Sequence, residues 1–160
     1  MGNYLFKPPK LIYVNLCQSI FLNHGIKCQD YYFFLKNIIE NNDNIVFKIG
    51  CSNFIGMERS FAELFDLFYA NKDKITIIIG EKLCNEQILL CYACKEVIFD
   101  NTYTCVLDNF FEINDCMEKY NLNLPKTKCV FELNKYLTNM RKISDNEKYI
   151  FVNNTMKFYE

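Results

Sequence analysis

The chain has 160 residues, of which 51% are apolar and 16% aromatic, so it can bury a core and is not intrinsically disordered. A net charge of −1 argues against direct nucleic-acid binding, because phosphate contacts need a clustered positive field. No apolar run approaches the roughly 20 residues of a membrane span, and residues 1–10 carry no signal sequence. We therefore expect no membrane association, a cytoplasmic or nuclear location, and nine reduced cysteines.

The first 43 residues are predicted to form an N-terminal extension that packs on the main domain. A short apolar run covers residues 11–16. Over residues 29–40 apolar side chains recur three or four positions apart, which predicts an amphipathic helix. The polar run at 41–44 reads as a linker, so the main domain is expected over residues 44–160.

The next elements follow a regular pattern. Residues 45–49 are predicted to form a strand that ends at Gly50. Ser60 and Glu63 form a capping box, and phenylalanine and leucine recur at helical spacing behind it, which predicts a helix with an aromatic buried face. Residues 75–79 are all β-branched, as expected for a central strand.

A second helix is predicted to begin near Cys84, with residues 88–94 buried against a sheet. Residues 102–107 are rich in β-forming residues and predict another strand. Asn109 and Glu112 resemble a helix cap, which predicts a third helix after them.

The last third of the chain is predicted to end in a hairpin and a helix. Leu124-Pro125 breaks the chain after the third helix. The runs 128–133 and 136–143 look like two strands joined by a short turn. Ser144 and Glu147 form another capping box, which predicts a final helix of about ten residues.

This order of elements resembles the thioredoxin fold, an α/β fold with a central mixed sheet flanked by helices. In that family a buried strand leads to a cysteine at the start of a helix, and a cis-proline precedes a later strand beside it. Here residues 75–79 lead to Cys84, and Pro125 lies at about the separation that the family shows. The resemblance covers roughly residues 44–155 and is one of pattern.

The resemblance implies a degenerate redox motif. The motif would fall on residues 84–87, where Cys84 takes the place of the attacking cysteine and Gln87 replaces its partner. Gln87 cannot resolve a mixed disulfide, so full dithiol exchange by this motif is not expected. A helix N-terminus can lower a thiol pKa, which leaves open a monothiol oxidoreductase that uses Cys84. The favoured interpretation is a packing cysteine with no catalytic role.

The first functional hypothesis is a non-catalytic thioredoxin-like protein-interaction module, a subunit or regulator of a larger intracellular assembly. Because the family binds extended peptides beside its proline, the resemblance implies a binding face formed by Cys84, Gln87, Leu124 and Pro125. The run Tyr-x-Leu-x-x-Pro-x-Thr at residues 120–127 is also similar to the spliceosomal thioredoxin-like proteins, which act as interaction platforms. No cofactor is expected.

A third hypothesis, after the interaction module and the monothiol enzyme, places binding at the two ends of the chain. The N-terminal segment is rich in aromatic residues, which are enriched at protein interfaces. Phe158 and Tyr159 belong to a Phe-Tyr-Glu tail that resembles the hydrophobic-Tyr-any tail of proteasome activators. A homodimer also remains open.

A zinc site could be drawn from four cysteines. Cys91 and Cys94 form a C-x-x-C pair, with Cys105 and Cys116 further on. A second close pair is missing, and the C-x-x-C pair lies within a predicted buried helix. We therefore expect core cysteines and no metal.

Overall fold

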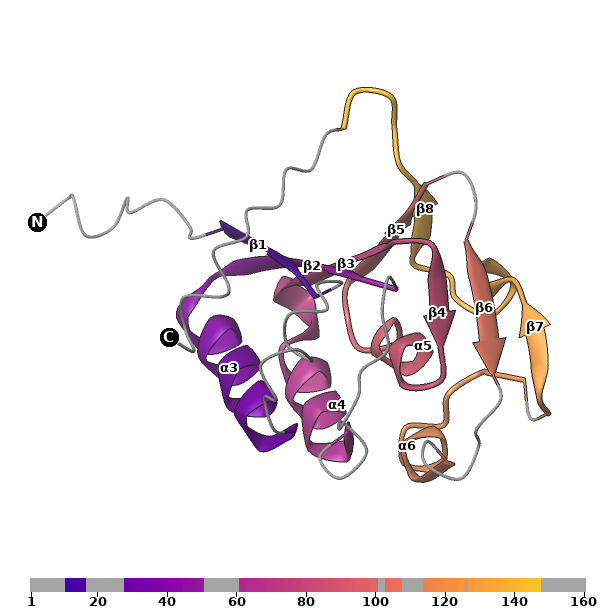
Figure 1. The fold of residues 1–160 in the computed structure, drawn as a ribbon, viewed down its shortest axis with the longest axis horizontal. Helices are drawn as coiled ribbons and strands as arrows, with labels where there is room; N and C mark the ends of the chain where they lie inside the picture. The colour runs from indigo at the N-terminus through magenta and orange to yellow at the C-terminus, as the bar shows by residue number, and fades with distance from the viewer. Residues whose placement is uncertain are drawn as a thin grey trace, which may run out of the picture.

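A parallel sheet of five strands forms the centre of the computed structural model (Figure 1). The structure describes residues 11–16, 28–50, 61–100, 103–107, 114–125 and 127–147. In spatial order the strands are β1 (Leu11–Asn15), β2 (Asn44–Ile49), β3 (Ile75–Ile79), β5 (Glu96–Phe99) and β8 (Met140–Lys142). Each neighbouring pair is parallel.

The helices lie on one side of this sheet, as Figure 1 shows for α3, α4 and α5. The helices are α3 (Cys28–Asn41), α4 (Phe61–Ala70), α5 (Glu86–Leu90) and α6 (Asn114–Lys119), with short 3-10 turns at Lys72–Lys74 and Leu133–Lys135. Because the strands follow one another in chain order, right-handed crossovers place the connecting helices on the same face. Among the described residues, no helix combines the length and apolarity needed to cross a membrane.

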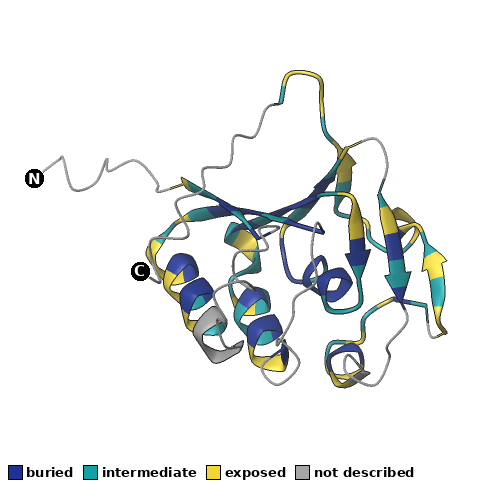
Figure 2. Cartoon of the chain, in the orientation of Figure 1, coloured by how far each residue is buried: buried dark blue, intermediate teal, exposed yellow. Residues whose placement is uncertain are grey.

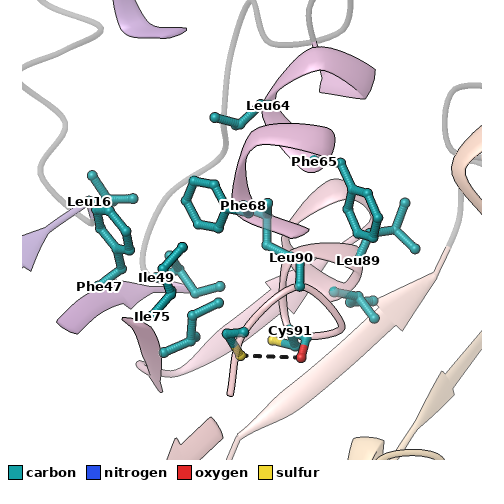
Figure 3. Close-up of a cluster of buried hydrophobic side chains, with 14 of the residues drawn as sticks. Leu16, Phe47, Ile49, Leu64, Phe65, Phe68, Ile75, Leu89, Leu90 and Cys91 are labelled. Atoms are coloured by element: carbon teal, nitrogen blue, oxygen red, sulfur yellow. Dashed lines mark hydrogen bonds between the residues drawn. The ribbon is translucent and has the colours of Figure 1, made fainter. Parts of the chain in front are cut away.

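The core lies between these helices and the sheet (Figures 2 and 3). The ring of Phe47 on β2 stacks on that of Phe68 on α4, with 5.1 Å between the centroids. From α3, Leu35 and Ile39 are fully buried in the same cluster. The segment predicted to be an extension therefore supplies a strand of the main sheet and a helix of its core layer.

A second, smaller sheet lies beside the first (Figure 1). Its order is β4 (Lys82–Cys84), β6 (Thr104–Leu107) and β7 (Cys129–Phe131). β4 and β6 are parallel, whereas β6 and β7 are antiparallel. The small sheet carries Cys84 and so positions the residue on which the sequence-based site depends.

The structure confirms the α/β class and several individual elements. A parallel-rich sheet is flanked by helices, and β3 is the middle strand, as its composition predicted. β2 begins one residue before the predicted strand and ends where predicted, and α4 begins directly after the predicted cap at Ser60. The predicted cap at Asn109 and most of the helix predicted after Ser144 lie outside the described residues.

The predicted terminal hairpin is wrong. β7 belongs to the small sheet, whereas β8 pairs in parallel with β5 at the edge of the main sheet. The intervening chain turns at Leu133–Lys135, and Asn139 then joins the sheet through its carbonyl, which accepts from Val97 N at 3.0 Å. β5 was not predicted, and the strand predicted at 102–107 lies in the small sheet.

Candidate functional site

Gly50 positions the strand that carries Cys84. Its φ is +94°, a region that residues with a side chain rarely adopt, and an added Cβ would lie 2.8 Å from the carbonyl oxygen of Lys82. Lys82 N donates to the Gly50 carbonyl at 2.8 Å, while Gly80 N donates to Ile49 O at 2.7 Å. The end of β2 therefore holds both ends of the turn between β3 and β4.

The side chains of β4 alternate between the core and the surface. Leu83 is fully buried in the main apolar cluster, whereas Lys82 is exposed and Cys84 is half-buried. Because successive side chains of a strand point to opposite faces, Cys84 lies on the face of the small sheet that points away from the core.

The register of the small sheet aligns Cys84 with two further side chains on the same face. Cys84 pairs with Val106 on β6, and Val106 pairs with Val130 on β7. Val106 is half-buried and Val130 is 69% exposed, which makes it the most exposed of the large apolar side chains in the described residues. We call Cys84, Val106 and Val130 the outer row. It forms an apolar strip across the small sheet.

The predicted helix after Cys84 is present but short. Asn85 has a φ of 45°, its N–H donates to Val106 O at 3.2 Å, and α5 begins at Glu86. Only five residues are helical, and the chain from Cys91 onward forms turns. A helix of little more than one turn has a weak dipole at its N-terminus. It therefore stabilises a thiolate less than the longer helix predicted from the sequence would.

The other residues predicted for the binding face differ from Cys84 in their exposure. Gln87 is only 3% exposed on α5, and Leu124 is buried in the main cluster. Pro125 is half-buried, and its peptide bond is trans, since the described residues contain no cis peptide bond. Phe158 and Tyr159 lie outside the described residues.

A hydrogen bond fixes the position of the segment that contains Pro125. The hydroxyl of Tyr92, which follows the end of α5, donates to Asn123 O at 2.6 Å. This contact places the Leu124–Pro125 segment near the C-terminal end of α5, whereas Cys84 lies ahead of its N-terminal end. Cys84 is thus a member of the outer row, and Pro125 follows a segment that is bonded to the chain after α5.

Three cysteines, Cys91, Cys94 and Cys105, are buried and form no disulfide with one another. Burial raises the pKa of Cys91 well above its usual value, and the neighbouring thiols of Cys94 and Cys105 add to this. Burial also raises the pKa of Cys94 and of Cys105 to about 12. The Cys94 thiol donates to Cys91 O and to Glu96 O, both at 3.4 Å. These are neutral core thiols, which are poor nucleophiles.

The thiols do not form a metal site in the described part of the chain. No three histidine, cysteine, aspartate or glutamate side chains there are placed to hold an ion together. The C-x-x-C pair lies in the turns after α5, where Cys91 and Cys94 are both buried in the main cluster. Their hydrogen bonds to main-chain carbonyls agree with the interpretation of core cysteines.

Sequence reasoning missed Val106 and Val130. An isolated valine in a predicted strand gives no sign of which face it occupies until the register of its neighbours is known.

Comparison of this chain with protein-family models, with curated proteins and with solved structures finds no match.

Proposed function

We propose that the protein is a non-catalytic protein-interaction module, a subunit or regulator of a larger intracellular assembly, and that it binds an extended segment of a protein partner at the outer row. The observation that carries this proposal is the exposure of Val130 at the centre of β7. In the structure as described, β7 pairs with β6 alone, so its other edge can accept hydrogen bonds from an added strand.

The outer row suits a partner with alternating apolar side chains. An added strand would lie about 4.8 Å from β7, and every second side chain would point to the same face as Val130. Main-chain hydrogen bonds would then supply affinity, while contacts with Val130 and Val106 would select apolar residues in the partner.

The topology of the main sheet supports binding of a protein over binding of a small ligand. Ligand sites in parallel sheets form where the strand order reverses, because two crossovers there leave in opposite directions and open a crevice. The described strands run in chain order from β1 to β8 with no reversal. The described sheet thus lacks the usual crevice for a cofactor or substrate.

A thioredoxin-like origin is part of the proposal. It is supported by Cys84 directly ahead of α5 and by Pro125 ahead of β7. The parallel pairing of β8 with β5 departs from the thioredoxin pattern, which ends in antiparallel strands. The function proposed for the outer row depends on its exposure and register and does not require this origin.

A monothiol oxidoreductase is the second candidate. The observation that favours it is the location of Cys84 on the outward face of the small sheet, where a thiol of another molecule could approach. Cys91, Cys94 and Cys105 are buried, and Cys129 points to the other face of the small sheet, so a mixed disulfide on Cys84 would need an external thiol for its release.

The proposal is tested by comparing three single substitutions at exposed apolar residues. Val130→Asp adds a charge to the outer row, Phe33→Asp does so on α3, and Leu11→Asp does so on β1; these side chains are 69%, 53% and 52% exposed. Each variant is used as bait in extract from cells that make the protein, and retained partners are quantified by mass spectrometry. The wild type and the Leu11 variant should retain the same partner. We expect the amount of that partner retained by Val130→Asp to be at least tenfold lower.

The same three variants also test the hypothesis that the protein binds through its aromatic N-terminal region. Loss of the partner with Phe33→Asp and not with Val130→Asp would move binding to the aromatic N-terminal region and would contradict the proposal. Each substituted side chain is more than half exposed, so all three variants should fold, which circular dichroism would verify.

A further inference from the structure

β7 has a charged side chain on either side of its exposed valine. Val130 lies at the centre of the strand and is 69% exposed. Lys128 directly precedes the strand and Glu132 directly follows it, and both are exposed. The backbone of Glu132 is extended, with φ −95° and ψ 119°, so it continues the strand. Because side chains alternate along a strand, we expect Lys128 and Glu132 on the face that carries Val130.

This pattern of charge, valine and opposite charge is complementary to itself when two copies run antiparallel. With the two Val130 residues opposite each other, Lys128 of one copy would lie opposite Glu132 of the other, once on each side of the twofold axis. On the inner face, the half-buried Cys129 would lie opposite the half-buried Phe131. The two outer rows would then meet as one apolar strip across the axis.

Other registers and directions lose this match. A slip of two residues would place Val130 opposite a charged side chain. A slip of one residue would align the outer face of one copy with the inner face of the other. Parallel pairing in register would place lysine beside lysine and glutamate beside glutamate. The match therefore selects one arrangement, an antiparallel pair with its twofold axis at Val130.

The edge strands of the main sheet have no such pattern. At the centre of β8, Arg141 is exposed and is followed by the exposed Lys142, so self-pairing would bring like charges together. β1 has no charged side chain that could define a register. β7 lies at the end of the small sheet that is farthest from the main sheet (Figure 1), so a second copy could approach it without meeting the described helices.

Glu132 already makes one ion pair within its own chain. Its carboxylate lies 3.7 Å from the Lys135 ammonium, and the two side chains are 68% and 72% exposed. A pair this exposed contributes little to stability and does not prevent a second cation from approaching. Glu132 can therefore accept Lys128 of a second copy while Lys135 stays beside it.

We propose that the chain forms a twofold dimer through antiparallel pairing of β7, in which the two three-stranded sheets join into one of six strands. This proposal rests on the proposed function, in which β7 accepts an added strand, and it names a second copy of this chain as the partner. A twofold pair is closed, because each copy covers the β7 edge of the other. Since one strand from each copy makes a small interface, the dimer should dissociate on dilution.

The test reverses each charge and then mixes the two variants. Lys128→Glu leaves acids at both flanking positions and Glu132→Lys leaves bases at both, so each variant alone would repel itself across the axis. Mixed one to one, the two variants are complementary again. By sedimentation velocity, we expect the dissociation constant of each variant alone to be about tenfold higher than that of the wild type, and the mixture to return to within about threefold of it.

The matched control is Lys142→Glu, which makes the same change of charge on β8, an edge strand of the main sheet. It should leave the dissociation constant within about twofold of the wild type. All three substituted side chains are exposed, so the variants should fold, which circular dichroism would verify. Recovery of the dimer in the mixture also shows that each variant is folded.

Three results would overturn the inference: a wild type that stays monomeric from the micromolar to the millimolar range, a mixture no stronger than either variant alone, or a Lys142 variant as weak as the Lys128 variant. A monomeric wild type whose Val130→Asp variant still loses a partner from the extract would overturn the dimer and leave the proposed function standing. A dimer that follows the charge pattern, with no other protein lost by Val130→Asp, would support the inference and confine the binding role to self-association.

Discussion

At Gly50 the backbone takes a φ of +94° and passes so close to Lys82 that an added methyl group would lie 2.8 Å from its carbonyl oxygen. Both the dihedral angle and the contact require glycine at this position. The added methyl group would meet a backbone oxygen, so no side-chain rotation could relieve the clash. Gly50 also helps to position Cys84, because its carbonyl bonds to the first residue of β4.

We predict that Gly50→Ala lowers the free energy of unfolding by about 1–3 kcal/mol, since it combines an unfavourable backbone conformation with a steric clash. Chemical denaturation followed by circular dichroism measures this difference. Lys82→Ala is the control, because it removes an exposed side chain and keeps the carbonyl, and it should change stability by less than about 0.5 kcal/mol. Equal stability of Gly50→Ala and the wild type would show that the turn relaxes freely.

Single residues of the candidate site were only partly predictable. A cysteine just ahead of a helix could be read from local pattern, and Cys84 is found there. Its location beside Val106 and Val130 could not be predicted, because strand register depends on residues far apart in the sequence. The buried state of Gln87 follows from the packing of α5 and likewise has no local signal.

At the scale of elements, α4 and α6 are joined through one carboxylate. The Tyr120 hydroxyl donates to Asp66, and the Lys119 ammonium lies 3.2 Å from the same carboxylate. The Tyr120 ring packs against Phe65 and Tyr69, with centroid distances of 4.9 and 4.5 Å. The hydrogen bond to Asp66 is the main reason that the Tyr120 pKa is raised.

We predict that Asp66→Asn lowers the Tyr120 pKa toward its ordinary value, because a neutral amide accepts the hydroxyl proton less strongly and adds no negative charge. The loss in stability should be about 0.5–1 kcal/mol, at the low end for a hydrogen bond because the pair is partly exposed. Titration by NMR with ring-labelled tyrosine measures the pKa. Asp73→Asn, at an exposed site on the turn after α4, is the matched control and should leave both quantities unchanged.

Element types were more predictable than element partners. The β-branched run of β3 has a strong local signal, and the strand lies at the centre of the sheet. β8 has three residues, two of them exposed and charged, so its apolar pattern is weak. Its pairing with β5 joins segments about 40 residues apart, and a short turn beside it made a hairpin with β7 look equally satisfactory. Chain proximity was a poor guide to pairing here.

At the scale of the whole molecule, the buried thiols make stability depend on pH. Burial disfavours the thiolate and raises the pKa of Cys94 and of Cys105 from the usual 9.0 to about 12 in the folded protein. Between these pH values the unfolded chain loses protons that the folded chain retains. Their contribution to stability is therefore complete below about pH 9 and is lost as pH rises toward 12.

We predict that the free energy of unfolding falls above pH 9, with each buried thiol adding a slope of up to about 1.4 kcal/mol per pH unit. Urea denaturation between pH 7.5 and 10.5 measures the slope. Cys94→Ala should reduce it, whereas Cys129→Ala, at a half-buried thiol on β7, should leave it close to that of the wild type. A slope that is the same in Cys94→Ala and the wild type would assign the effect to other groups.

The α/β class of the whole molecule followed from alternating strands and helices, yet its two-sheet arrangement did not. The small sheet is built from β4, β6 and β7, three short strands that come from distant parts of the chain. β4 and β6 each bury one face against the main cluster, β7 packs on it through the half-buried Phe131, and the outer row lies on the other face. The surface that we propose for partner binding thus arises from tertiary pairing, which composition and periodicity do not encode.

The most direct test of a non-catalytic role is the alkylation rate of Cys84 at pH 7 in the native protein. Mass spectrometry can follow Cys84 and Cys129, the two half-buried thiols of the small sheet, in the same reaction, with Cys84→Ser as the control. We predict that Cys84 reacts no faster than Cys129. A Cys84 that reacts at least tenfold faster, with a pKa clearly below the usual range of a cysteine thiol, would contradict the account and favour the monothiol enzyme.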